Sequence, residues 1–202
     1  IENHVIVGPH MYCAGKGICM TGGHGWQEGI EADGKDACLK AVRTQLRSGV
    51  DLIKMMATGG VMTKGVEPGN AQFTVDEMKV MNEEAHKAGR KTATHAQGLQ
   101  GIRNALYAGI DSIEHGSFLD DECLERMKEQ NTFLVPTLCA PQCIIDKGVE
   151  NGVAKYAVDK TLKVKDAHVE SVKKAYEKGI QIALGTDAGT PFNYHSNTAY
   201  EM

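Results

Sequence analysis

Hydrophobic and polar positions along the chain follow one recurring unit. An amphipathic segment ends in a glycine, and a short run rich in apolar and β-branched residues follows at once. The unit occurs at Gly49, Gly89, Gly109 and Gly179. A glycine just past a helix can adopt the left-handed conformation that closes the helix. Asn131 occupies the same place in a variant of the unit. The pattern therefore predicts helices that lead directly into strands.

Several of these helices have recognisable starts. Thr74 and Glu77 form a capping box, in which each side chain binds the backbone N–H of the other. Asp33 and Asp120 are predicted to begin two further helices. Residues 150–178 predict one long or broken helix with a solvated face from Lys160 to Lys174, and His168 is expected at the surface.

Six strands are predicted between the helices, near residues 10–14, 50–56, 91–95, 110–115, 132–138 and 180–185. Strands that alternate with helices indicate β-α units and a parallel sheet. The longest strand-to-helix connections, 58–73 and 185–200, are rich in glycine. In a (β/α)8 barrel such loops lie at the face that carries the chemistry. We expect an α/β fold, a partial (β/α)8 TIM barrel, with an open doubly wound sheet as the alternative that this pattern allows.

Composition and charge exclude several classes of protein. Of the 202 residues, 42% are hydrophobic and 24% are charged, which is typical of a globular protein. The formal net charge of −4 gives no electrostatic footprint for nucleic acid. No apolar run approaches the roughly 20 residues of a membrane span, and no nucleotide-binding glycine motif occurs. The six cysteines lack paired zinc spacing, so we expect free thiols and, by default, a cytoplasmic protein. The true N-terminus is not visible, which leaves secretion open.

Four reactive side chains follow the repeated glycines at nearly constant offsets. Lys54, His95, His115 and Asp187 stand five to eight residues after the glycine of their unit. This offset places them at the C-terminal ends of different strands, which meet at one mouth in a barrel. Two imidazoles and a carboxylate are good zinc ligands, and burial should lower the pKa of a lysine at such a place. The pattern favours a metal site; the alternative is that each residue is an ordinary polar residue at a strand end.

The segments around these residues resemble a known family. They read IKMMATGG around Lys54, THAQ around His95, SIEHG around His115 and GTDAG around Asp187. In this order they resemble the amidohydrolase superfamily, in its branch of prolidase-like and Xaa-Arg carboxypeptidase-like metal-dependent hydrolases. Imidazolonepropionase is a more distant relative. The resemblance extends from the GGHG segment at Gly22 to the HSN segment at His195.

The resemblance implies a barrel with two divalent metal ions, usually zinc. Lys54 would then be carboxylated by CO2 and bridge both metals as a carbamate. His95 and His115 would bind the second metal. Asp187 would bind the first metal and act as the general base.

The resemblance also implies substrate-binding residues and a reaction. His24 resembles a histidine that hydrogen-bonds the scissile carbonyl, and His195 and Asn197 are expected to line the pocket. A metal-activated hydroxide would cleave the amide or peptide bond of a dipeptide or N-acyl amino acid. A cyclic-amide hydrolase or deaminase of the same superfamily, and an inactive barrel fragment or binding module, are the alternatives. We expect a homo-oligomer that acts on a small peptide, with neither nucleic acid nor membrane as partner.

The sequence departs from the family at one point. The superfamily supplies two ligands of the first metal as an H-x-H pair on the first barrel strand, and no H-x-H occurs in this chain. We therefore expect residues 1–202 to be an incomplete metal-dependent hydrolase domain, roughly strands 3–8, truncated at both ends. The H-x-H strand and the flanking β-sandwich of the family are absent from it.

Overall fold

The computed structural model describes residues 5–202 of the chain, so residues 1–4 of the predicted domain lie outside it. Its strands are β1 Ile18–Cys19, β2 Ile30–Glu31, β3 Leu52–Met56, β4 Lys91–Ala96, β5 Ser112–His115 and β6 Phe133–Val135. Its α-helices are α1 Lys35–Arg47, α2 Val75–Lys87, α3 Leu99–Tyr107, α4 Asp121–Gln130, α5 Cys139–Lys147 and α6 Lys155–Glu177. Two 3-10 helices, η1 Val149–Asn151 and η2 His195–Glu201, complete the set.

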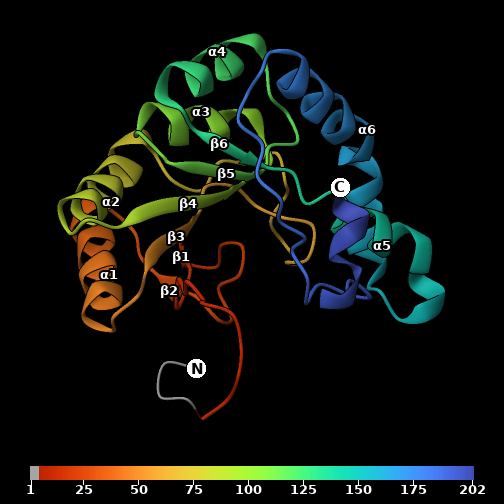
Figure 1. Cartoon of the computed structure of the whole chain (residues 1–202), viewed down its shortest axis with the longest axis horizontal. Coiled ribbons are helices and arrows are strands. Elements are labelled where there is room, and N and C mark those ends of the chain that lie inside the picture. Colours follow the sequence, from red (N-terminus) through yellow and green to blue (C-terminus); the bar gives the residue numbers. More distant parts are fainter. Residues whose placement is uncertain (1–4) are drawn as a thin grey trace.

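The strands form one parallel sheet in the order β2-β1-β3-β4-β5-β6. From β3 to β6 each strand pairs with the next one along the chain, and the order reverses only at the two-residue strands β1 and β2. A doubly wound sheet has helices on both faces, whereas the helices of a barrel form an outer ring. Figure 1 shows α1 to α6 as an arc outside the curved sheet. The predicted α/β fold and partial TIM barrel are confirmed.

Two of the predicted strands are wrong in detail. Residues 10–14 form no strand, because Cys13 instead exchanges hydrogen bonds with the backbone and carboxylate of Asp51. Residues 180–185 contribute only a bridge between Ile182 and Leu134 of β6. In the described part of the chain no strand pairs with the other edge of this segment, so its ladder stays short.

The predicted helix ends are confirmed. Gly49, Gly89, Gly109 and Gly179 have φ values between 70° and 83°, and Asn131 closes α4 with φ 56°. The positive φ of these residues lets the chain leave each helix and enter the next strand within a few residues.

The predicted helix starts are confirmed except at Asp33. Thr74 and Glu77 make the capping box of α2, and Asp120 accepts from the Cys123 N–H at the start of α4. Asp33 does not cap α1, because its carboxylate binds the backbone N–H and hydroxyl of Thr21.

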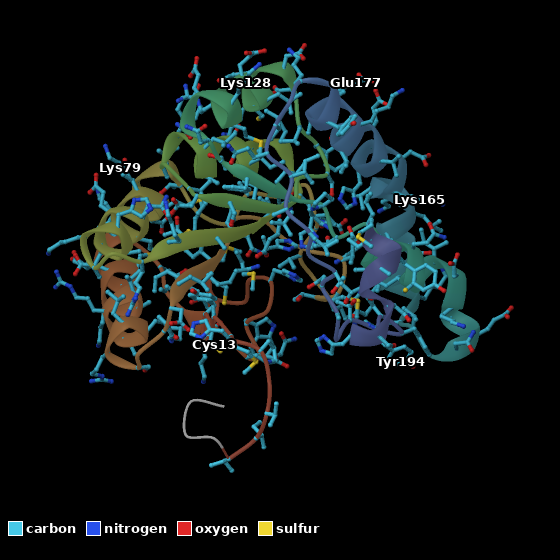
Figure 2. All side chains as sticks on the ribbon, viewed as in Figure 1. Cys13, Lys79, Lys128, Lys165, Glu177 and Tyr194 are labelled. Atoms are coloured by element: carbon cyan, nitrogen blue, oxygen red, sulfur yellow. The ribbon has the colours of Figure 1, made fainter. Side chains whose placement is uncertain are left out.

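The predicted helix at 150–178 is present as η1 and α6, but two of its residues lie elsewhere than expected. Lys160 is only 5% exposed and His168 only 2% exposed, so both predictions of surface positions are wrong. α6 packs between solvent and the strand-end loops, and its inward face carries these polar side chains. Figure 2 shows Glu177 on the outer side of the same helix.

The main core lies between the sheet and its helices, where strand residues such as Ile53, Ile113 and Leu134 pack against α2 and α4. A smaller cluster of Ile144, Val153 and Ala157 joins α5 and α6 to loop residues Val61 and Met62. All six cysteines are free. No helix within residues 5–202 is both long and apolar enough to cross a membrane.

Candidate active site

A cavity of about 200 Å³ lies at the C-terminal ends of the strands. Its polar wall consists of His24, Lys54, His95, Gln97, Glu114, His115, His168, Asp187 and Thr190. The structure thus brings together the four side chains that the spacing placed at strand ends. Strand register accounts for part of this arrangement, because His95 pairs with Met56 of β3 and with Glu114 of β5.

The cavity contains a row of three imidazoles. The ring centroids of His24 and His95 are 4.3 Å apart, and those of His95 and His115 are 4.6 Å apart. His95 Nε2 lies 2.8 Å from the Gly59 carbonyl oxygen, and His115 Nδ1 lies 2.6 Å from Thr137 Oγ1. Burial, reinforced by neighbouring positive charge, holds the pKa values of His95 and His115 well below the ordinary range. Both rings are therefore neutral at neutral pH.

Lys54 reaches across β4 and forms an ion pair with Glu114 of β5. Burial lowers the pKa of Lys54 to about 8, although the charge of Asp187 opposes the shift. Glu114 was missed in the sequence because it directly precedes His115, and alternation along a strand suggests opposite faces for neighbours. The left-handed backbone of His115, with φ 68°, breaks that alternation and explains how both side chains line one cavity.

Asp187 is a buried carboxylate beside this pair. Burial raises its pKa above the ordinary value, while the charge of Lys54 acts in the opposite direction. Its φ is 54°, and Thr137, which binds His115, has φ 55°. Such conformations cost of order 1–3 kcal/mol each in residues other than glycine, and they cluster at functional sites.

His24 is fixed by the loop of residues 59–66. Its Nδ1 lies 2.8 Å from Thr63 Oγ1, and the same oxygen accepts from the Gly25 N–H at 3.3 Å. The ring also lies directly over Gly60, where a Cβ atom would clash with it. Burial, with the positive charges of Lys54 and Lys160, lowers the pKa of His24 to about 4. His24 is therefore neutral.

Lys160 anchors this loop from α6. Its ammonium donates to the carbonyl oxygens of Val66 at 2.5 Å and Thr63 at 2.8 Å, and it lies 3.5 Å from that of Gly60. The Tyr156 hydroxyl, one turn earlier, donates to the Met62 carbonyl at 3.0 Å. The sequence indicated that 58–73 is a long loop, but gave no sign that a helix lysine about a hundred residues away holds it.

His168 is a further cavity residue that the sequence analysis placed at the surface. Burial lowers the pKa of His168, and the backbone carbonyls of Pro136 and His115 act in the opposite direction. The Nε2 atom of His168 has no hydrogen-bond partner among the described residues. Of the two predicted pocket residues on the last loop, Asn197 lines a second, neighbouring cavity, and His195 is exposed and lines neither.

The donor set fits divalent metal ions in its chemistry. His95 and His115 are neutral, and each has one ring nitrogen bound to a protein oxygen, which leaves His95 Nδ1 and His115 Nε2 outside those bonds. Metal-binding histidines are usually oriented in this way. Within residues 5–202 no three His, Cys, Asp or Glu side chains converge closely enough to hold a metal ion by themselves. A metal site here would therefore need Lys54, which is not among those four types, or ligands from outside these residues.

A model of the amidohydrolase family matches residues 1–202. The chain belongs to the amidohydrolase family. This is a family of hydrolytic enzymes, in agreement with the resemblance of the four strand-end motifs.

Two groups of relatives are similar in sequence to this amidohydrolase chain. The ochratoxinase of Aspergillus niger is 35% identical over 212 residues, which cover 93% of this chain and 44% of that protein. An uncharacterized protein of Mycobacterium tuberculosis is 27% identical over 176 residues, which cover 86% of this chain and 46% of that protein. The chain thus spans less than half the length of these relatives.

Solved amidohydrolase structures have the same fold. A Xaa-Pro dipeptidase with methionine bound in its active site aligns with a TM-score of 0.90 and 34% identity, over 99% of this chain and 52% of that one. The A. niger ochratoxinase aligns with a TM-score of 0.86 and 33% identity, over 99% of this chain and 50% of the ochratoxinase chain. A prolidase complexed with N-methylphosphonate-L-proline aligns with a TM-score of 0.87 and 27% identity, over 96% of this chain and 51% of the prolidase chain.

Proposed function

We propose that this chain is part of a metal-dependent amidohydrolase and carries catalytic groups at the C-terminal ends of its strands. The enzyme would cleave an amide or peptide bond in a small substrate. One observation carries the proposal: Lys54, His95, His115 and Asp187, from separate β-α units, line one cavity at the C-terminal ends of the strands. Strand ends at this face are where barrel enzymes place their catalytic groups.

In this proposal Lys54, as a carbamate, and the side chains of His95, His115 and Asp187 supply part of the ligand set of two divalent ions. The H-x-H pair of the family, which these 202 residues lack, would supply the other ligands of the first ion. Neutral imidazoles and carboxylates favour zinc as the metal. When bound, the ions would lower the pKa of a water molecule and polarise the substrate carbonyl. The lowered pKa of Lys54, about 8, supports the carbamate, because only the neutral amine adds CO2.

In this proposal Asp187 transfers protons, and His24 orients the substrate carbonyl. The raised pKa of Asp187 brings its carboxylate closer to the range in which it can take a proton from water and pass it to the leaving nitrogen. Because Thr63 Oγ1 accepts from Gly25 N–H, its own hydrogen is available to His24 Nδ1. His24 then has its hydrogen on Nε2 and donates it to the carbonyl oxygen of the substrate.

The relatives support a dipeptide or an N-acyl amino acid as the substrate. One related structure is a Xaa-Pro dipeptidase, and another is a prolidase bound to a phosphonate of proline. A tetrahedral phosphorus on the proline nitrogen has the shape that an amide carbon takes when water adds to it. The identity of the metal, a homo-oligomeric state and a cytoplasmic location stay predictions.

The test uses the full-length protein that contains this chain. We expect about two zinc ions per chain, as in two-metal hydrolases, and hydrolysis within a panel of Xaa-Pro dipeptides and N-acyl amino acids. Chelation should abolish turnover, and zinc with bicarbonate should restore it. Lys54→Met should lose metal and turnover, whereas Lys79→Met, at an exposed lysine of α2 (Figure 2), should keep both. A folded wild type without metal or turnover would refute the proposal and favour the inactive binding module.

A further inference from the structure

Helix α6 carries a row of exposed apolar side chains. Leu162, Val169 and Tyr176 are 55%, 52% and 77% exposed. Among the α-helices of residues 5–202, only α6 has large apolar side chains that are more than half exposed. Their spacing of seven residues is about two helical turns, so the three side chains point the same way. Single exposed apolar residues are common, but an aligned row indicates an interaction surface.

Two charged residues complete this row. Asp166 and Lys173 are exposed and lie between the apolar residues, so that the steps along the row alternate between four and three residues. This is the spacing of the seam along which two helices pack in a coiled coil. Within residues 5–202 neither of these two side chains forms an ion pair, whereas Glu170 beside them pairs with Lys174 at 3.9 Å. The two charges of the row are therefore free to pair with another molecule.

The order of the charges selects the partner. Asp166 precedes Val169 by three residues, and Lys173 follows it by four. When two copies of α6 run antiparallel and meet at Val169, the rise of about 1.5 Å per residue brings Asp166 of one copy beside Lys173 of the other. Leu162 then lies beside Tyr176 of the second copy. In a parallel pair each charge would lie beside the same charge, which is unfavourable.

We propose that α6 is the contact surface of a two-fold symmetric dimer of this protein, in which the α6 rows of two copies pack antiparallel. A two-fold interface must be complementary to itself, and the antiparallel pair meets this condition with two ion pairs and a continuous apolar contact. Figure 1 shows α6 on the outside of the arc of helices, where a second copy has access. None of the five row residues lines the strand-end cavity, so the inference goes beyond the proposed hydrolase and does not depend on it.

Sedimentation velocity of the full-length protein over a series of concentrations tests the inference. Val169→Asp places two like charges at the centre of the contact and should raise the dissociation constant of the dimer at least about a hundredfold. Asp166→Lys should raise it about tenfold, because each of two ion pairs becomes a repulsion. The double variant Asp166→Lys with Lys173→Asp should return it to within about threefold of wild type, since the exchanged charges again lie opposite each other.

Glu129→Lys is the matched control, because Glu129 is an exposed acid on α4 outside the row, and its dimer should dissociate as the wild type does. Circular dichroism shows whether each variant is folded, and the charge exchange decides the test if Val169→Asp does not fold. A monomeric wild type would overturn the inference and indicate that another part of the full-length protein covers the row. An oligomer that Val169→Asp leaves intact, or a double variant that stays as weak as Asp166→Lys, would overturn it as well.

Discussion

Lys160 provides the sharpest test of how this site is held together, because its buried ammonium joins α6 to the loop that orients His24. We consider Lys160→Met, which keeps most of the apolar stem and removes the charge. Hydrogen bonds to a charged group contribute about 1.5–3 kcal/mol each, and two lie within 2.8 Å here. The cost of burying the ammonium offsets part of this, so we expect a net loss of about 3 kcal/mol of unfolding free energy. For a domain of this size that lowers Tm by about 6–12 °C.

The assay combines thermal unfolding with hydrogen exchange of the loop amides. In Lys160→Met the amides of residues 59–66 should exchange faster, while those of α2 should keep their protection at temperatures well below Tm. Turnover should fall about tenfold under the same conditions, because Thr63 no longer holds His24 in one orientation. Lys163→Met is the control, since Lys163 is exposed on the same helix. A Tm and loop exchange equal to those of Lys163→Met would refute the reasoning.

Three further changes give separate tests. Asp187→Asn should reduce kcat more than a thousandfold with Tm unchanged within a few degrees, and retained turnover would remove Asp187 from the chemistry. Gly60→Ala should lower kcat/KM at least tenfold by displacing the His24 ring, and wild-type kinetics would contradict the close packing. Burial would raise the pKa of Asp111, but hydrogen bonds from Lys91, His86 and Thr92 outweigh burial and lower it. This carboxylate therefore stabilises the fold above its unfolded pKa of about 3.9, and the contribution is lost as the pH falls through the lower folded value. Denaturant unfolding should show Asp111→Asn less stable at pH 7 and equal to wild type at the acid end; a constant difference would contradict the assignment.

Local rules recovered the repeating part of the fold. The glycine at each helix end and the capping residues Thr74 and Asp120 act on residues close to them in the chain. Their positions can therefore be predicted from the local sequence. The strands near 10–14 and 180–185 were misjudged, because a strand exists only when a neighbour pairs with it. Pairing partners are distant in sequence, and no local pattern specifies them.

At the candidate site, too, local patterns predicted some features and only the three-dimensional structure revealed others. The offsets after each glycine predicted that Lys54, His95, His115 and Asp187 would share one mouth, and the structure brings them to one cavity. The alternation along β5 predicts that Glu114 and His115 lie on opposite faces, so Glu114 was not predicted. The left-handed backbone of His115 breaks this alternation, and both side chains line the cavity.

The sequence by itself determined the β-α repeat, the helix ends and the four strand-end side chains, since each depends on residues close together in the chain. Only the tertiary structure decided that Lys160 and His168 are buried. An amphipathic helix shows that a polar side chain lies near the boundary of its faces, but not whether a loop covers it. That depends on the loop of residues 59–66 and on the C-terminal segment, which reach α6 from distant parts of the chain. The loop provides hydrogen-bond partners for Lys160, whereas His168 Nε2 has none among the described residues.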